Sequence, residues 1–547
     1  MPHVSQHVAV ALARHIDQVF GLMGNGNAHF LDAILRHTSA SFTAVRHEAG
    51  AVVAADAHYR ASGRIAAATT TYGAGFTNTL TALAEAAQAR VPLVLIVGDE
   101  PTSGPRPWDV DQIALASAVG VRTYTAGRLD AAASTVIAIE HALSYRVPVV
   151  LAIPYDVPTL EAGEVPPTPP LHLPQPQEPS PATRAAIARV AEALAAAERP
   201  LLLAGRGAHL AGARTALGAL ADATGAITAS TALGRGVFPD PRHDLGVTGG
   251  FGAPGAMELI READVAVVLG ASLSPFTMRF GELFSPGTRV AQVDVAPTAT
   301  HPRVGEFLQG DVRVIAEHLV RALDGATPSG WRESVDLTPL RVQDPGERTA
   351  ADGRLDPRSA AARIGELLPE DRIVVSDGGH FIAWANMYWP VASPERMIMV
   401  GTAYQSIGLG FPSVAGAVQA APSATVVLTT GDGGGLMALA DLETAVRTAG
   451  GRGMCVVWND GAYGAEVNLY GLKGLAEAPM LIPDVDFAAL GAAVGAEGVV
   501  VRDLADLEHL ARWTARPVEE RPFLLLDLRV SRSVIAPYQR EVIRVNS

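Results

Sequence analysis

Residues 424–461 read ATVVLTTGDGGGLMALADLETAVRTAGGRGMCVVWNDG, and this stretch decides the fold. Two short apolar runs, 424–429 and 454–458, each end in a polar turn, and a predicted helix over about 436–448 lies between them. Continuous apolar runs that alternate with helices are typical of parallel strands covered on both faces. Because the carboxyl ends of such strands meet at one edge of the sheet, we expect Asp432 and Asn459 to lie close together.

The residue types at these two strand ends predict a metal site. Asp432 stands in the triplet Gly431-Asp432-Gly433, and Asn459 is followed two residues later by Gly461. Carboxylate, amide and loop carbonyl oxygens suit a Mg²⁺ ion that also holds a diphosphate. The glycines let backbone N–H groups approach phosphate oxygens at a helix start. The alternative is that the triplet is a tight turn and that Asn459 caps a loop. The strand before each element favours the metal site.

The same alternation of apolar runs and alanine-rich stretches extends over all 547 residues. Examples of the apolar runs are 93–97, 265–269 and 373–376. Two proline-containing polar stretches, 157–181 and 325–354, read as linkers because proline interrupts helices and central strands. We therefore predict an α/β protein of three doubly wound parallel-sheet domains, at 1–160, 182–325 and 355–535.

Composition excludes several classes of function. Hydrophobic residues make up 48% of the chain and charged residues 18%, so sizeable cores are expected. The net charge of −14 argues against binding to nucleic acid or to an anionic membrane. A single cysteine, Cys455, excludes an internal disulfide framework. The chain shows no secretory signal and no apolar run long enough for a membrane span. A cytoplasmic location is therefore expected.

With these motifs the chain resembles the thiamine diphosphate-dependent enzymes of the pyruvate decarboxylase and acetolactate synthase superfamily. The resemblance covers nearly the whole sequence. It implies a pyrimidine-binding domain, a central domain and a diphosphate-binding domain, in that order. It also implies that Asp432, Asn459 and the carbonyl of Gly461 coordinate Mg²⁺, and that Gly433 and Gly434 lie beside the diphosphate.

The first domain provides a second point of resemblance. Residues 46–51, RHEAGA, are similar to the family segment that places a glutamate, here Glu48, against N1′ of the aminopyrimidine. A Glu shielded from water can share a proton with that nitrogen, which favours the imino form of the 4′-amino group that activates C2. The alternative is a helix-start Glu favoured by the helix dipole. The turn 71–78 is similar to the family's pyrimidine-pocket turn, which implies contacts from Thr71, Gly73 and Asn78.

Two further segments of the third domain resemble the family. In 405–412, QSIGLGFP, the position of Ile407 implies a wedge that bends the cofactor, with Ser406 beside it. The alternative is an ordinary core isoleucine. In 377–380, DGGH, Gly379 and His380 correspond to a loop that touches the diphosphate.

The reaction depends on side chains that these motifs do not determine. Asn25 stands roughly where simple decarboxylases of the family carry Asp, and the chain has no adjacent His pair, which weakens the plain-decarboxylase interpretation. His29 is either a substrate-facing acid or base or a solvated helix-start residue. The loop 104–112 either selects the substrate or is a surface turn. The segment 463–480 is either a lid or a surface helix. The central segment 270–276 lacks the Arg of the flavin-binding synthases, so FAD is not expected.

We therefore predict a thiamine diphosphate- and Mg²⁺-dependent decarboxylating carboligase, similar to acetolactate synthases. It would remove CO₂ from a 2-oxo acid and join the remaining unit to a second carbonyl compound, such as an aldehyde or ketone. The alternatives are a 2-oxo acid decarboxylase or C–C lyase that releases an aldehyde, and a non-catalytic cofactor-binding scaffold. The resemblance implies a homodimer or homotetramer whose active sites are shared between chains. The residues assigned to catalysis are Glu48, Asn25 and His29, and those assigned to the cofactor are Glu48, Thr71, Gly73, Asn78, Gly379, His380, Ser406, Ile407, Asp432, Gly433, Gly434, Asn459 and Gly461.

Overall fold

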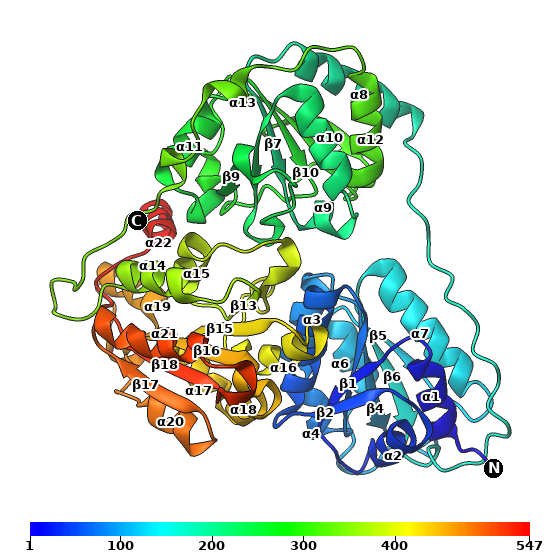
Figure 1. Ribbon diagram of the computed structural model, residues 1–547. Helices are drawn as coiled ribbons and strands as arrows, with labels where there is room; N and C mark the ends of the chain where they lie inside the picture. The colour runs from blue at the N-terminus through cyan, green and yellow to red at the C-terminus, as the bar shows by residue number, and fades with distance from the viewer. Residues whose placement is uncertain (547) are drawn as a thin grey trace.

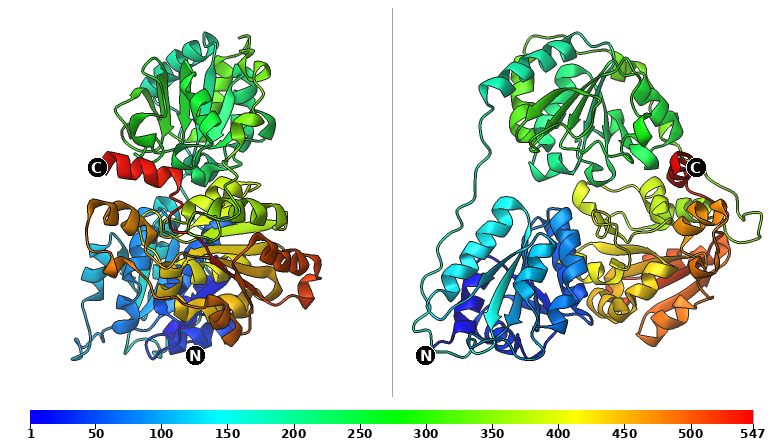
Figure 2. Two further views of the ribbon diagram at one scale, coloured as in Figure 1. Left: turned by 90° about the vertical axis from the view of Figure 1, so that its left-hand side faces the viewer. Right: turned by 180° about the vertical axis from the view of Figure 1, so that it is seen from behind.

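The computed structural model describes residues 1–546, which form three α/β domains (Figure 1). Each domain contains a six-stranded sheet whose paired strands all run parallel. Helices cover both faces of each sheet, as the views from the side and from behind also show (Figure 2). The predicted fold class is thus confirmed. Within residues 1–546, no helix combines the length and the apolarity that crossing a membrane requires.

The first domain has the strand order β2-β1-β3-β4-β6-β5. Its innermost strands, β3 and β4, are buried along their whole length, which explains why they are continuous apolar or small-residue runs. The strands are β1 Gln18–Gly21, β2 Ser41–Ala44, β3 Ala66–Thr70, β4 Leu93–Asp99, β5 Arg122–Thr125 and β6 Pro148–Pro154. The helices are α1 Val4–Ala13, α2 Ala28–His37, α3 Glu48–Ser62, α4 Ala74–Thr77, α5 Leu80–Gln88, α6 Gln112–Ala118 and α7 Ala131–Tyr145.

The central domain has the strand order β12-β11-β10-β7-β8-β9. Its strands are β7 Pro200–Ala204, β8 Ile227–Ser230, β9 Asp244–Val247, β10 Val265–Leu269, β11 Arg289–Asp294 and β12 Val304–Gln309. Its helices are α8 Pro181–Ala195, α9 Arg206–Leu210, α10 Arg214–Thr224, α11 Pro254–Arg261 and α12 Val312–Ala322, and the short helix α13 Trp331–Ser334 follows in the second linker.

The third domain has the strand order β14-β13-β15-β16-β18-β17. Its strands are β13 Arg372–Ser376, β14 Met397–Met399, β15 Thr425–Gly431, β16 Gly453–Asn459, β17 Glu497–Val501 and β18 Leu524–Arg529. Its helices are α14 Pro357–Leu367, α15 Ile382–Tyr388, α16 Gly410–Ala420, α17 Asp432–Met437, α18 Leu442–Ala449, α19 Gly464–Leu469, α20 Phe487–Ala493, α21 Glu508–Ala515 and α22 Pro537–Asn546.

The sequence predicted one helix over about 436–448, but the structure has two helices in this region, so the prediction was wrong in this detail. Helix α17 begins at Asp432 itself, and a 3₁₀ turn over Leu439–Asp441 separates it from α18. The side chain of Asp441 accepts hydrogen bonds from the hydroxyl of Thr444, at 2.7 Å, and from the backbone N–H of Arg46, at 2.8 Å. The 3₁₀ turn between the two helices therefore places the buried carboxylate of Asp441 where it accepts a hydrogen bond from the first domain.

The first and third domains meet along helices α3 and α16, which pack against each other. The approach is very close because both helices consist largely of small residues. A Cβ atom placed on Gly416 of α16 would lie 2.0 Å from the carbonyl oxygen of Ala54 in α3. This contact joins segments that are more than 350 positions apart in the chain.

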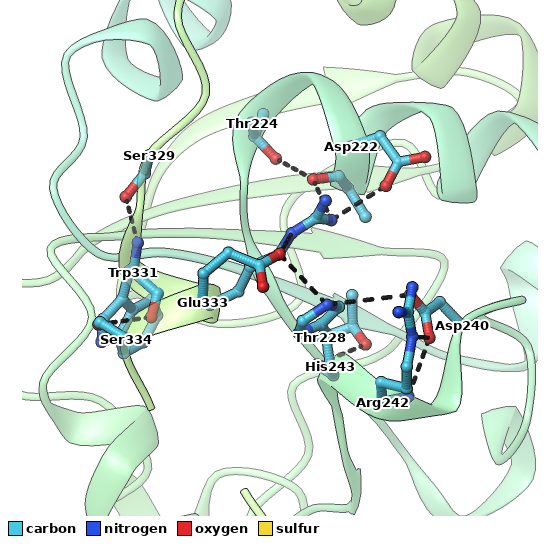
Figure 3. Close-up of polar contacts among 12 residues, drawn as sticks. Asp222, Thr224, Thr228, Asp240, Arg242, His243, Ser329, Trp331, Glu333 and Ser334 are labelled. Carbon is cyan, nitrogen blue, oxygen red and sulfur yellow. Dashed lines mark hydrogen bonds and ion pairs between the residues drawn. The ribbon is translucent and has the colours of Figure 1, made fainter. Parts of the chain in front are cut away.

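The two linkers differ in how they run. Residues 157–181 contain no regular helix or strand before α8 and extend along the outside of the molecule from the first to the central domain (Figures 1 and 2). The second linker docks back onto the central domain (Figure 3). There Trp331 is buried, Arg332 forms a 3.0 Å ion pair with Asp222, and Glu333 lies 3.5 Å from His243.

The close approach at Gly416 gives a first prediction. Replacing Gly416 with Ala forces a methyl group against the backbone of α3, and we expect this overpacking to lower stability by about 1–3 kcal/mol. A control is Gly287→Ala, because no atom lies within 4 Å of the Cβ position there. Thermal unfolding of both variants beside the unmodified protein measures the effect. Equal melting temperatures for all three would show that α3 and α16 do not pack as described.

Candidate active site

The loops at the carboxyl end of the third sheet are held together by one buried carboxylate, Asp377, which follows β13. Its oxygens accept the backbone N–H groups of Gly378 at 2.8 Å and Gly408 at 3.0 Å. They also accept the hydroxyl of Thr430, at the end of β15, at 3.0 Å. Burial raises the pKa of Asp377, and these hydrogen bonds partly offset that rise. Asp377 thus connects the loop 377–380, the turn before α16 and the end of β15.

Asp432 and Asn459 lie at the ends of neighbouring strands, β15 and β16, and both are 2% exposed. The two oxygens of Asp432 accept the backbone N–H groups of Gly433 and Gly461, each at 2.9 Å. The amide nitrogen of Asn459 donates to Asp527 at 2.9 Å and to the carbonyl of Val485 at 3.0 Å. Both amide hydrogens are therefore used, and no donor among residues 1–546 contacts the side-chain oxygen of Asn459.

The third predicted donor, the carbonyl oxygen of Gly461, accepts a hydrogen bond from the N–H of Ile482 at 2.9 Å. A carbonyl oxygen has two lone pairs, so one remains. Across residues 1–546, no three His, Cys, Asp or Glu side chains cluster as metal ligands would. A metal at this site therefore depends on amide and carbonyl oxygens in addition to Asp432.

A second acid, Asp460, lies beside Asp432. Burial, followed by the negative charge of Asp432, raises the pKa of Asp460 to about 7, and burial raises the pKa of Asp432 to about 6. Neither carboxyl forms an ion pair within residues 1–546. Arg532 and Arg354 act on Asp460 through their charge, but they lower its pKa less than burial and Asp432 raise it. A bound divalent cation would stabilise two such adjacent buried acids.

His380 is buried, and its ring is fixed by the segment before α22. Its Nε2 accepts the backbone N–H of Ala536 at 3.0 Å, and the hydroxyl of Tyr538 donates to the carbonyl of His380 at 3.2 Å. Burial lowers the pKa of His380 to about 4, so the ring is neutral near pH 7. His380 is therefore a neutral polar group of this site.

A cavity opens directly beside these groups. It is lined by residues at the ends of β13, β15 and β16, including the predicted Gly379, His380, Ile407, Asp432, Gly433 and Gly434. Ile407 is half-buried, and its side chain faces this cavity rather than a sealed core. Ser406 precedes it, and its N–H donates to the carbonyl of Gly401 at 2.8 Å.

The predicted residues of the first domain form a second cluster. Glu48 is the first residue of α3, and its Oε2 accepts the amide N–H of Asn78 at 3.0 Å. Gly75 lies against this carboxylate, since a Cβ there would be 3.6 Å from Oε1 of Glu48. Thr71 accepts the N–H of Gly26 at 2.9 Å. The glutamate, the glycine-rich turn and the turn after β1 are thus adjacent.

The structure gives Asn25 and His29 exposed positions. The amide of Asn25 donates to the hydroxyl of Tyr72 at 3.1 Å. His29 lies on the first turn of α2. The neighbouring Asn27, which the sequence analysis did not select, is buried and fixes the turn through Leu22 and Thr69.

The loop 104–112 is a fixed structure built around Arg106. Its guanidinium forms a bidentate ion pair with Asp109, at 2.7 and 2.8 Å, and lies over the rings of Tyr72 and Tyr155 at 4.3 and 4.4 Å. The charge of Arg106 is therefore already paired. At the end of the loop, buried Gln112 accepts the N–H of Gly73 at 2.7 Å.

Within residues 1–546, the first-domain cluster does not line the cavity at Asp432. Every residue that lines the cavity at Asp432 belongs to the range 357–534. None of Glu48, Thr71, Gly73 and Asn78 is among them.

Comparison with known proteins identifies the family. Residues 2–117 match the model of the thiamine pyrophosphate enzyme N-terminal TPP binding domain. Residues 187–319 match the central domain of these enzymes, and residues 377–527 match their C-terminal TPP binding domain. The chain belongs to the thiamine pyrophosphate enzyme family. Thiamine pyrophosphate and thiamine diphosphate are the same compound, so the resemblance in the motifs is confirmed.

Similar proteins of this thiamine pyrophosphate family align over nearly their whole length. A sulfoacetaldehyde acetyltransferase of Castellaniella defragrans is 27% identical, over 98% of this chain and 94% of the relative. An acetolactate synthase large subunit of Parasynechococcus marenigrum is 27% identical, over 95% and 86%. The acetolactate synthase isozyme 3 large subunit of Escherichia coli is 26% identical, over 95% and 93%.

The residues present fit thiamine pyrophosphate with a divalent metal. The floor of the site consists of glycines at which a side chain would collide with its neighbours: a Cβ on Gly434 would lie 2.7 Å from Asp377, and one on Gly433 would lie 2.6 Å from Tyr463. Asp432 and Asn459 present the hard oxygen donors that Mg²⁺ prefers.

Several residues of this thiamine pyrophosphate enzyme were missed as site residues by the sequence analysis. Asp377 was visible only as part of the motif 377–380, and Gln112 only as the end of the loop 104–112. Their hydrogen bonds span 31 and 39 positions of the chain. Asp460 was visible as an acid next to Asn459, which was a usable signal. Tyr538 lies beyond the expected domain end at 535, and no local motif marks it.

The neutral state of His380 predicts a pH dependence. In the unfolded chain a histidine takes up a proton near pH 6.5, whereas His380 in the folded protein does so only near pH 4. Acid therefore favours unfolding, and stability is lost as the pH falls from about 6.5 to 4, by up to about 3 kcal/mol. We expect His380→Gln to lose less stability over this range, as measured by urea unfolding at pH 7, 6 and 5. Parallel curves for the two proteins would contradict this.

Proposed function

We propose that this thiamine pyrophosphate enzyme is a Mg²⁺-dependent carboligase that decarboxylates a 2-oxo acid and joins the remaining acyl unit to an aldehyde or ketone. The main support is that the chain aligns over nearly its full length with acetolactate synthases while it keeps Glu48, Asp432 and Asn459 at the motif positions. A non-catalytic scaffold would not require this acid and these metal donors together.

The third domain would hold the diphosphate end of the cofactor. Asp432, Asn459 and the carbonyl of Gly461 would bind Mg²⁺, which in turn would bind the phosphate oxygens. Backbone groups of Gly379, Gly433 and Gly434, together with neutral His380, would contact the diphosphate. Ile407, half-buried at the cavity wall, would support the bend of the cofactor.

When bound, the cofactor supplies a carbon nucleophile and an electron sink for the loss of CO₂. Glu48 would share a proton with the pyrimidine nitrogen N1′, and Asn78 would hold the Glu48 carboxylate in position through its 3.0 Å hydrogen bond. Asn25 and His29, which lie in and just after the turn following β1, would move protons on the substrate side. Arg106 is paired with Asp109 and would shape the loop rather than bind a substrate anion.

The active sites would be shared between two copies of the chain. Among the described residues 1–546, Glu48 does not line the cavity at Asp432, which favours a site in which the first domain of one copy meets the third domain of another. We therefore propose a homodimer, or a homotetramer built from two such dimers.

Product analysis tests the proposed reaction. Purified protein with thiamine diphosphate and Mg²⁺ is incubated with a panel of 2-oxo acids, with and without added aldehydes. CO₂ release is followed and products are identified by chiral chromatography and mass spectrometry. We expect CO₂ together with a coupled hydroxyketone. CO₂ with only free aldehyde would instead assign a simple decarboxylase, and bound cofactor without CO₂ from any acid would refute both.

Mixing two inactive variants tests shared sites. We expect Glu48→Gln and Asp432→Ala each to lower the rate of CO₂ release about 100-fold or more. A mixed dimer would contain one site with both native residues, so random mixing should restore up to about a quarter of the native rate. Native mass spectrometry confirms that mixed dimers form. Mixed dimers that remain inactive would contradict shared sites.

A further inference from the structure

A second and larger cavity adjoins the cofactor site. Its volume is about 860 Å³, and it lies between the loops of the central domain and the third domain. It shares Gly378, Gly379 and Ile407 with the cavity at Asp432. A molecule in the second cavity would therefore reach the wall against which the cofactor is proposed to bend.

Three aromatic rings form one wall of this cavity. Phe251 and Phe276 come from the central domain and Tyr538 from α22, and their ring centroids are 4.7 to 5.8 Å apart. The hydroxyl of Tyr538 donates to the carbonyls of Gly379 and His380, at 3.4 and 3.2 Å. The aromatic wall is thus fixed to the same loop that borders the cofactor site.

Two charged side chains line the cavity where it meets the first domain: Arg60 on α3, and Arg206 on α9 of the central domain. Among the described residues, its only charged lining side chains are Arg60 and Arg206. Arg60 is paired with Asp56 and Glu85, and Arg206 donates to the carbonyl of Ala89. No carboxylate lines the cavity. Beside the aromatic wall the remaining polar groups are hydroxyls such as those of Ser274 and Thr277.

Size and polarity together restrict what the cavity would hold. Sites for whole small molecules have volumes of roughly 300–1,000 Å³ and are mostly apolar. This cavity falls in that range, and it is far larger than the methyl group of a small acid such as pyruvate requires. A wall of three aromatic rings favours an apolar ring, because aromatic pairs contribute more than the area they bury.

We propose that this cavity receives a bulky, uncharged and preferably aromatic group carried by the carbonyl substrate, and that Phe276 selects for it. This rests on the proposed function, because it assigns the substrate class of the same site. The group belongs either to the 2-oxo acid or to the acceptor aldehyde. The shared chemistry is a carbonyl compound whose side group is an apolar ring.

Selectivity measurements on the holoenzyme distinguish the two sources. The first arm compares kcat/KM for CO₂ release from benzoylformate and from pyruvate. The second compares coupling to benzaldehyde and to acetaldehyde, with the best 2-oxo acid as donor. We expect a preference of about tenfold or more for the aromatic compound in at least one arm, which corresponds to the burial of one ring. A preference for the small compound in both arms would overturn the proposal.

Variants connect this preference to the aromatic wall. We expect Phe276→Ser to reduce the preference for the aromatic compound about tenfold, mainly by raising the KM of that compound. Phe276→Tyr should retain the preference. Ile382→Ser, at the start of α15 in the same cavity, provides a second test if Phe276→Ser does not fold. The matched control is Tyr145→Ser, because Tyr145 is exposed on α7 and does not line the cavity. An unchanged preference in both cavity variants would overturn the proposal.

A binding measurement separates this inference from the proposed function. Benzyl alcohol, which has no carbonyl, is titrated into holoenzyme, and its binding is followed by saturation-transfer NMR. We expect saturable binding to the native protein and to Tyr145→Ser, and about tenfold weaker binding to Phe276→Ser. If no acid releases CO₂ but this dependence holds, the proposed function fails and the cavity assignment stands. If acids turn over but binding does not depend on Phe276, the cavity assignment fails. A flavin bound tightly to the purified protein would also overturn it.

Discussion

The site depends on one constraint: the carboxylate of Asp377, buried inside the third domain, must receive hydrogen bonds there. A buried carboxylate is costly unless several donors surround it, and here those donors are backbone groups of separate loops. The hydrogen bonds to Asp377 therefore fix the position of Gly378 and that of Gly408, the neighbour of Ile407. They also fix the end of β15, just before Asp432. The proposed metal donor Asp432 and the proposed wedge Ile407 are therefore positioned by the same group of hydrogen bonds.

The fold could be predicted from the sequence wherever a buried element produces a recognisable pattern of apolar residues. Central strands such as β10 at Val265–Leu269 are continuous apolar runs, and they appear where they were expected. The edge strand β5 was missed because it is short and partly polar, with the sequence RTYT. The division between α17 and α18 was missed because it depends on Asp441 binding Arg46 of another domain, which no local pattern records.

The candidate site likewise contains residues that the sequence could indicate and residues that it could not. Residues in short motifs, such as Asp432, Asn459 and Glu48, could be selected because strand–turn–helix geometry restricts which residue types can stand there. The aromatic wall could not be selected, because Phe251, Phe276 and Tyr538 come from distant segments and each resembles an ordinary apolar residue in isolation. Motifs therefore point to the residues proposed to bind the cofactor, whereas the groups proposed to meet the substrate are defined only by tertiary packing.

The packing of α3 against α16 has a consequence for how the protein is made. The first domain is complete in sequence long before α16 is synthesised, yet the part of α3 around Ala54 packs closely against that later helix. During synthesis, and during any refolding, this part of α3 remains in water while more than 350 residues are added or rearranged. The yield of native protein should therefore be governed by the lifetime of this unpaired surface, and by chaperones that cover it, more than by the final stability.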